Sequence, residues 1–252
     1  MNQIRIEACC GSVDDCVLAA GAGVDRIELN SALFLGGLTP SYGTIQETLS
    51  LALPVQTMVM IRPRSGGFHY TDAEFRTMCR DAELAVSLGA DGLVFGSLTA
   101  CGMPDEEQVR TLVGIAGTCQ TVFHRAIDVC PDWRPAMELL ISLGVTRILT
   151  SGQQPTALEG SQTIRAMREF ACGQIEILPA GGIRHLNAAE IIEKTGCSQI
   201  HFAKHVYLPD PSMQQTNRIA FHGHDAPEDR YPQCDAAYFG EMRRIVDRIQ
   251  AG

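Results

Sequence analysis

Two patterns of apolar positions alternate along the chain. Short apolar runs, typical of buried strands, are separated by longer segments in which apolar residues recur every three or four positions, as in helices. The apolar runs lie at residues 4–9, 25–29, 55–61, 91–95, 120–124, 146–150, 175–179 and 199–202. Buried strands that alternate with helices predict an α/β fold with a parallel sheet.

A repeated motif indicates how many strand–helix units the chain contains. Each copy reads glycine, a variable residue, Asp, Thr or Ser, another variable residue, and then an Ile- or Leu-led apolar run. The copies begin at Gly23, Gly89, Gly144 and Gly196. Each glycine follows a helical pattern, where a left-handed C-terminal cap is expected, and the spacings suit two units per repeat. The sequence therefore predicts eight units that close into a single (β/α)8 TIM barrel over residues 1–252.

Local signals support this division and mark one exception to it. Thr71 and Glu74 form the pattern of a capping box before a helix, and residues 187–195 form a short amphipathic helical pattern. Residues 205–234 are rich in proline, glycine and polar residues. We expect this segment to be an irregular loop or lid between the eighth strand and the last helix.

The composition narrows the classes of function. A formal net charge of -9 argues against a nucleic-acid or anionic-membrane partner, because both need a basic face. No apolar stretch approaches the roughly 20 residues that a membrane-spanning helix requires. Ten cysteines without an export signal predict a cytoplasmic protein with reduced thiols, and none of them forms a CxxC pair.

Alternation along the strands predicts which side chains face the lumen of the barrel. The outer faces should be apolar because they meet helices, which places the isoleucines of residues 4–6 and Ile27 outside. The polar lumen set is then Glu7, Cys9, Glu28, Asn30, Glu176 and His201. Three interior carboxylates must hold protons or be compensated by arginines. The arginines available for this are Arg5, Arg26, Arg62 and Arg147.

The carboxyl ends of the strands carry the candidate site, because active sites of such barrels lie there. The acid–base candidates are Glu7, Glu28, His124, Asp128 and His201. The candidates for binding an anion are Arg62, Arg64, Arg125 and Ser151. The alternative is an ion-pair network that only holds the barrel together.

Gly181 and Gly182 follow the seventh strand, where TIM barrels often bind phosphate. We expect them to open a helix and to present backbone N–H groups to an anion. A plain tight turn is the alternative.

For a metal ion, the candidate ligand is Cys9. The neighbouring Cys10 cannot chelate with it, because adjacent side chains on a strand point to opposite sides. Met58 and Met60 are further soft candidates, although methionines more often fill a core.

These polar stretches resemble the CutC family of copper homeostasis proteins. The matching segments are residues 7–9, 22–29, 36–41, 61–64, 123–128 and 149–152. The resemblance implies a single TIM barrel in the cytoplasm, often homo-oligomeric, that takes part in copper homeostasis through Cu(I) binding by cysteine.

The chain departs from the family pattern at Asn30, where the family commonly has a second cysteine. An amide is a weak ligand for Cu(I), so a two-thiolate site on Cys9 cannot form as in relatives. Three functions therefore stay open. The first two are copper handling through Cys9 and an enzyme acting on a small phosphorylated or carboxylated substrate. In the enzyme, Arg62 and Arg64 would hold the anion, Glu28 or Glu7 would act as base, and His124 would donate a proton. A ligand-binding regulator without turnover is a third reading.

Overall fold

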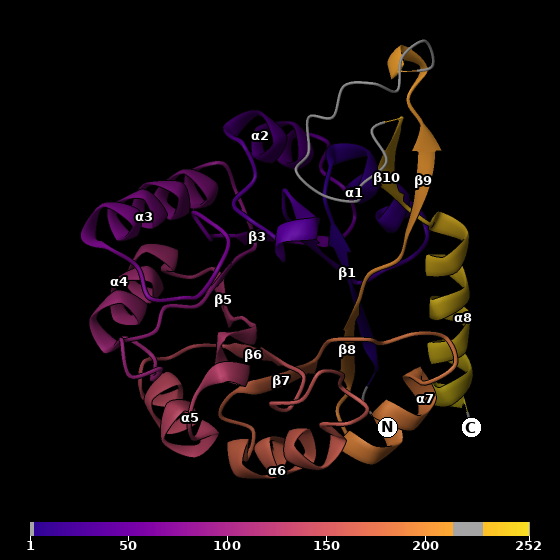
Figure 1. The fold of residues 1–252 in the computed structure, drawn as a ribbon. Helices are drawn as coiled ribbons and strands as arrows, with labels where there is room; N and C mark the ends of the chain where they lie inside the picture. The colour runs from indigo at the N-terminus through magenta and orange to yellow at the C-terminus, as the bar shows by residue number, and fades with distance from the viewer. Residues whose placement is uncertain (1–2, 214–228, 252) are drawn as a thin grey trace.

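Eight parallel strands surround a central axis in the computed structural model, which describes residues 3–213 and 229–251 (Figure 1). The strands are β1 (Arg5–Cys10), β2 (Arg26–Leu29), β3 (Gln56–Met60), β4 (Gly92–Phe95), β5 (Gln120–Phe123), β6 (Arg147–Thr150), β7 (Glu176–Pro179) and β8 (Gln199–Phe202). Each begins and ends within two residues of a predicted apolar run. The predicted TIM-barrel fold is confirmed.

The strand order is β7-β6-β5-β4-β3-β2-β1-β8, so β1 pairs with both β2 and β8. Among the described residues no ladder of backbone hydrogen bonds joins β7 to β8. The Gln199 side chain instead bridges this seam, since its Nε2 donates to the carbonyl oxygen of Ile177 at 3.2 Å. The barrel is therefore nearly closed, with one seam.

Helices cover the outside of the barrel (Figure 1). They are α1 (Val13–Gly21), α2 (Tyr42–Ser50), α3 (Asp72–Ser87), α4 (Glu106–Ala116), α5 (Trp133–Ser142), α6 (Ser161–Ala171), α7 (Ala188–Thr195) and α8 (Ala236–Ala251). Short 3-10 turns are η1 (Leu33–Leu35), η2 (Arg125–Val129) and η3 (Pro211–Met213). The capping box of Thr71 and Glu74 is present, and the four repeat glycines all adopt positive φ. None of the helices in the described ranges has the length and apolar character of a membrane span.

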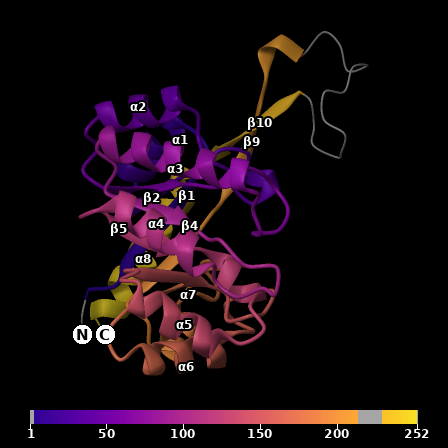
Figure 2. The same ribbon diagram turned by 90° about the vertical axis from the view of Figure 1, so that its left-hand side faces the viewer.

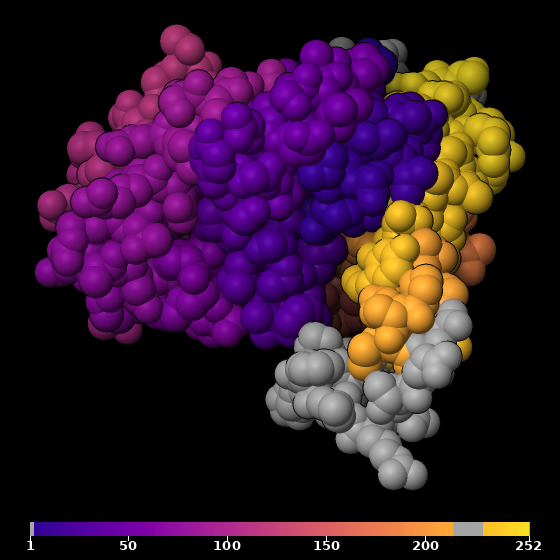
Figure 3. Space-filling view, turned by 90° about the horizontal axis from the view of Figure 1, so that it is seen from above, coloured from indigo at the N-terminus to yellow at the C-terminus, as the bar shows by residue number. Residues whose placement is uncertain are grey.

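The segment predicted to be irregular contains a two-stranded ribbon. Strands β9 (His205–Pro209) and β10 (Arg230–Cys234) pair antiparallel, with His205 opposite Cys234 at the base. Figure 2 shows the ribbon extending away from the barrel, and in Figure 3 its orange and yellow atoms border the barrel body. The prediction of an irregular segment was wrong here, because prolines and charged residues conceal the strand pattern. Residues 214–228, also within that prediction, lie outside the described residues.

The part of the lumen nearest the amino ends of the strands, called the lower lumen here, contains the two buried arginines Arg26 and Arg147. Arg26 Nε pairs with Glu7 Oε2 at 2.8 Å, and Arg147 Nε pairs with Glu176 Oε2 at 2.7 Å. An apolar cluster also fills the lumen, and it consists of Met58, Met60, Val94, Val122, Leu149, Leu178 and Ala180. Arg26 thus compensates the buried Glu7 as predicted, whereas Arg5 is exposed. Glu176, the partner of Arg147, was predicted to lie in the interior but has an exposed side chain. A charged lower layer leaves the upper end of the lumen for the site.

Candidate functional site

A cavity of about 550 Å³ opens at the carboxyl ends of the strands. Its lining residues are Cys9, Glu28, Asn30, Leu33, Gly36, Met60, Arg62, Phe68, His124, Arg125, Asp128, Val129, Leu149, His201, Ala203 and His205. Glu28, Arg62 and His124 come from three different strand ends and meet in this one cavity. The sequence prediction that these groups converge is confirmed.

His201 on β8 is held in a fixed orientation by Glu7 on β1. Its Nδ1 lies 2.9 Å from Glu7 Oε1, and the two residues are register partners. Burial alone would raise the pKa of Glu7, but the His201 hydrogen bond and the Arg26 guanidinium lower this pKa to about 2. Glu7 is therefore an ionised carboxylate that keeps a proton on Nδ1 and orients Nε2 of His201.

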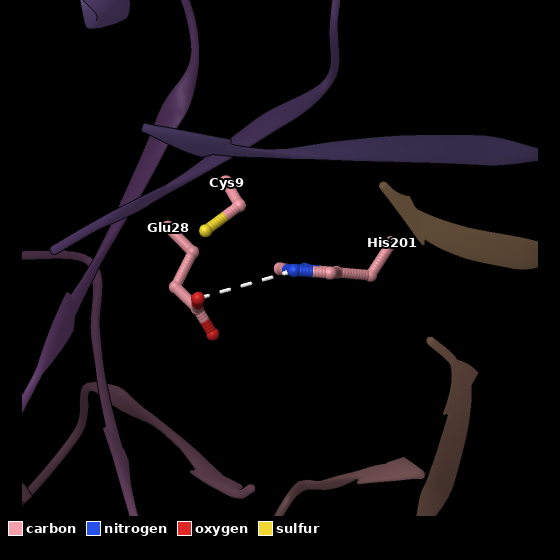
Figure 4. Close-up of side chains that lie close together, drawn as sticks. All are labelled: Cys9, Glu28 and His201. Carbon is pink, nitrogen blue, oxygen red and sulfur yellow. Dashed lines mark ion pairs between the residues drawn. The ribbon is translucent and has the colours of Figure 1, made fainter. Parts of the chain in front are cut away.

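Cys9, Glu28 and His201, which all line the cavity, lie close together and point toward one another (Figure 4). One ligand atom from each residue lies within 4.8 Å of those of the other two. His201 Nε2 lies 3.9 Å from Glu28 Oε2, the contact that is dashed in Figure 4. The group combines a thiol, a carboxyl and an imidazole, all of which can bind a metal ion.

The surroundings of these three side chains favour the protonated forms of Glu28 and Cys9. Burial raises the pKa of Glu28, with a smaller opposing effect from His201. Burial also raises the pKa of the Cys9 thiol, and the Glu28 carboxyl adds to this. The pKa of His201 is raised as well, because the two glutamates outweigh its desolvation.

Asn30 occupies the position at which the resemblance implies a second cysteine. Its Nδ2 donates to Glu28 Oε2 at 2.8 Å and to Cys9 Sγ at 3.4 Å. A Cβ at Gly37 would collide with Asn30 Oδ1, so this glycine lets the η1 loop close over the amide. The Asn30 amide therefore donates hydrogen bonds to Cys9 and Glu28 from the position where a second cysteine would offer a metal ligand.

His124 follows β5 on the other side of the cavity. Its Nδ1 accepts a hydrogen bond from the Ala126 N–H at 3.1 Å, so a proton on the neutral ring lies on Nε2. Burial and the nearby Arg62 lower the pKa of His124 to about 3. The ring is thus neutral and offers an N–H donor rather than an imidazolium.

The two arginines predicted to bind an anion have different surroundings. Arg62 donates to the carbonyl oxygens of Leu35, Gly37 and Gly66, so most of its guanidinium fastens loops. Only its Nε lacks a partner among the described residues. Arg64 lies outside the cavity lining and pairs with Glu74 at 2.5 Å.

Arg125, Asp128 and Ser151 join two loops at the rim. Asp128 accepts hydrogen bonds from Arg125 Nε at 2.8 Å and from the backbone N–H of Ser151 at 2.9 Å. Arg125 Nη2 also donates to Ser151 Oγ at 2.6 Å. Arg125 and Asp128 line the cavity, but Ser151 does not.

Gly181 and Gly182 do not open a helix. Helix α7 begins at Ala188 with Asn187 as its N-cap, and neither glycine is among the cavity-lining residues. Both have positive φ, and the Gly181 carbonyl accepts from the Ala157 N–H. The prediction of a helix start was wrong because the chain makes a left-handed turn first.

Gly96 is a site residue that the sequence did not single out. A Cβ there would collide with Cε1 and Nδ1 of His124, so the imidazole lies in the space that a side chain would take. The only signal in the sequence is a glycine directly after the fourth apolar run.

Comparison with known proteins assigns the chain to a family. The model of the CutC family matches residues 4–206. A CutC family protein of Treponema denticola is 48% identical over 250 residues, covering 99% of this chain and 100% of that protein. The chain belongs to the CutC family. A human relative, named copper homeostasis protein cutC homolog, is 43% identical over 200 residues, covering 79% of this chain and 73% of its own length.

Solved structures agree with this assignment. A crystal structure described as the putative copper homeostasis protein CutC of Streptococcus agalactiae matches with a TM-score of 0.76 and 37% identity. It covers 79% of this chain and 98% of that one. Thiamine phosphate pyrophosphorylase of Pyrococcus furiosus matches at TM-score 0.58 with 15% identity, a likeness of fold alone.

Proposed function

We propose that this CutC family member takes part in copper homeostasis by binding Cu(I) as cargo at the mouth of the barrel. Cys9 and His201 are the proposed ligands, with the Glu28 carboxyl beside them. The observation that carries the proposal is the Glu7–His201 contact. A carboxylate that holds Nδ1–H turns Nε2 toward Cys9 and Glu28, which is how metal-binding histidines are usually oriented. Because the pKa of His201 is raised, a bound ion must displace a proton from Nε2.

The chemistry of the donors favours Cu(I) over harder ions. Thiolate and imidazole are soft and borderline ligands, which suit Cu(I). Glu28 keeps its proton more readily than an exposed glutamate because its pKa is raised, so it adds little fixed negative charge. Binding requires Cys9 to lose its thiol proton, and the raised pKa of Cys9 makes affinity increase with pH.

The test is an anaerobic titration of reduced protein with Cu(I) against a competing chelator. We expect Cys9→Ser to weaken the affinity by on the order of a hundredfold and His201→Gln by at least about tenfold. Cys119→Ser is the matched control, because its partly buried thiol lies away from the mouth and donates to the Ala90 carbonyl. Affinity that is equal in wild type, Cys9→Ser and Cys119→Ser contradicts the proposal.

A second candidate function is an enzyme that acts on a small anion. Four buried polar atoms of cavity-lining residues have no partner in the described structure: Glu28 Oε1, Asn30 Oδ1, Arg62 Nε and His124 Nε2. Buried polar groups are normally paired, so this pattern favours a polar ligand between them. Here Arg62 and His124 would donate to the anion and Glu28 would exchange a proton with it.

A thermal-shift screen with inorganic phosphate, phosphosugars and hydroxy acids tests this second function. A ligand that raises the melting temperature of wild type but not of His124→Phe supports it. Arg62→Ala is not a clean test of anion binding, because it would also release three loop carbonyls. No shift with any of these compounds contradicts it.

We also propose a cytoplasmic homo-oligomer, as the family resemblance implies. The ribbon exposes Val206, Tyr207 and Tyr231, which are unusually large apolar side chains for a solvated hairpin. Light scattering of the full chain, with Tyr231→Lys as the variant, measures the oligomeric state. A monomeric wild type contradicts this proposal.

A further inference from the structure

A second cluster of metal-ligating side chains lies where the ribbon joins the barrel. It consists of Asp15 on α1, His205 at the start of β9 and Cys234 at the end of β10. One ligand atom from each lies within 4.8 Å of those of the other two. Cys234 Sγ lies 3.8 Å from His205 Nε2.

The fold holds these three groups together from distant parts of the chain. His205 and Cys234 are register partners across the ribbon, so they face each other. The Asp15 carboxylate accepts from the Cys234 N–H at 2.6 Å and from the Gly11 N–H at 2.9 Å. These bonds fix both carboxylate oxygens and still leave each with a free lone pair.

A further thiol borders the cluster. The neighbouring thiols of Cys16 and Cys234 raise the pKa of the Cys10 thiol, and all three cysteines are buried. Cys10 belongs to β1 but faces the helices, whereas Cys9 faces the cavity at the mouth. The two clusters therefore lie on opposite sides of one strand.

We propose that Asp15, His205 and Cys234 bind a single Zn²⁺ ion, with a water molecule in the fourth position. A thiolate, an imidazole and a carboxylate are the ligands that Zn²⁺ takes in proteins, and three of them with a water complete a tetrahedral site. The carboxylate makes the set harder than Cu(I) prefers. This inference goes beyond the proposed function, since it concerns another ion at another site.

The arrangement gives the ion an entry path and a role. His205 lines the mouth cavity, so an ion can approach its imidazole from there, while Cys234 is buried behind it. The bound ion links α1 to both strands of the ribbon at its base. An isolated two-stranded ribbon is marginally stable in water, so such a link would stabilise it.

The test titrates reduced full-length protein with Zn²⁺ against a chromophoric chelator, in wild type and in Cys9→Ser. We expect Cys9→Ser to keep a Zn²⁺ site and His205→Gln to weaken it by on the order of a hundredfold. Cys234→Ser should act in the same direction. Co²⁺ as a spectroscopic probe should show a thiolate charge-transfer band in Cys9→Ser that is lost in His205→Gln.

Two results would overturn the proposal. One is the absence of Zn²⁺ binding in Cys9→Ser, which would leave the cluster as a hydrogen-bonded anchor of the ribbon. The other is binding in Cys9→Ser that His205→Gln and Cys234→Ser leave unchanged. Neither result bears on Cu(I) at the mouth, which the Cys9→Ser titration with Cu(I) measures separately.

Discussion

At the scale of the residue, Asn30 has the greatest influence on the proposed copper site. It is buried, and its amide donates to both Cys9 and Glu28. An N–H donor stabilises a nearby thiolate, but it occupies a sulfur lone pair that a metal ion would use. The barrel mouth therefore has one thiol ligand where a cysteine at this position would supply a second.

We expect Asn30→Cys to raise Cu(I) affinity by at least about tenfold, because a thiolate is a far better ligand for Cu(I) than an amide. The same anaerobic competition titration measures it. Asn30→Ala is the control, since it removes the amide without adding a thiol. If Asn30→Cys binds no more tightly than Asn30→Ala, Cu(I) does not lie between these two strands.

Glu7 makes stability depend on pH. Its pKa falls from the usual 4.5 to about 2 in the folded protein, so folding favours the ionised form. The resulting stabilisation, about 3 kcal/mol, is present above pH 4.5 and is lost as the pH falls toward 2.

Chemical denaturation of wild type and Glu7→Gln between pH 3 and pH 7 measures this effect. We expect the variant to be less stable at pH 7 and to lose less stability on acidification. Glu190→Gln, which removes an exposed partner of Lys194, is the control and should follow wild type. Parallel curves for Glu7→Gln and wild type would show that Glu7 carries no such linkage.

At the scale of the element, a side chain that follows one strand can keep its position only if the loop after the neighbouring strand leaves room for it. The imidazole of His124 after β5 lies against Gly96 after β4. We expect Gly96→Ala to displace the imidazole, to break its hydrogen bond from Ala126 and to destabilise the fold by about 1–3 kcal/mol.

Denaturation and the NMR signals of the His124 ring measure the effect of Gly96→Ala. Gly114→Ala on α4 is the matched control, because a Cβ there meets nothing within 4 Å. We expect this control to be neutral or slightly stabilising, since alanine is the better helix former. An unmoved His124 ring in Gly96→Ala would show that the neighbouring loop yields instead.

Elements with a strong apolar pattern were predictable, and those without one were not. The barrel strands are buried on both faces and read as apolar runs, and parity placed Glu7, Cys9 and Glu28 in the lumen. The ribbon has only a weak pattern because much of it is exposed. Cys234, at the end of the segment expected to be irregular, lies on β10.

The sequence did not predict the role of a candidate site residue where its hydrogen-bond partner lies in another loop. Nothing near Arg64 in sequence shows that Glu74 binds it outside the cavity. In the same way, the loop carbonyls that Arg62 binds depend on how the η1 loop folds back. Residue type and strand position predict the neighbourhood of a side chain, but its hydrogen-bond partners depend on the tertiary structure.

At the scale of the whole molecule, the described part of the barrel has one seam without a ladder of backbone hydrogen bonds, between β7 and β8. Gln199 bridges it by donating to the Ile177 carbonyl and by accepting from Arg26 Nη2 at 2.6 Å. This single side chain therefore connects the seam to the buried charge network of the lower lumen.

We expect Gln199→Ala to destabilise the protein by about 2 kcal/mol, because it leaves a buried guanidinium N–H and a carbonyl unpaired. It should also speed hydrogen exchange of the β7 and β8 amides. Gln120→Ala is the matched control: Gln120 accepts from Arg147 at 2.6 Å, but β5 is paired on both sides. Equal exchange at β7 and β8 in the two variants would contradict a weak seam.

The two adjacent cysteines of β1 have a practical consequence. Cys9 is partly exposed in the cavity, whereas Cys10 is sealed between β1 and α1. An alkylating reagent can approach the first sulfur from the cavity, where it reacts slowly because the raised pKa keeps the thiol protonated. It can approach the second only after α1 separates from the sheet. The ratio of label on Cys10 to label on Cys9, read by fragmenting the one peptide that contains both, therefore reports how often the wall of the barrel opens, without any engineered probe.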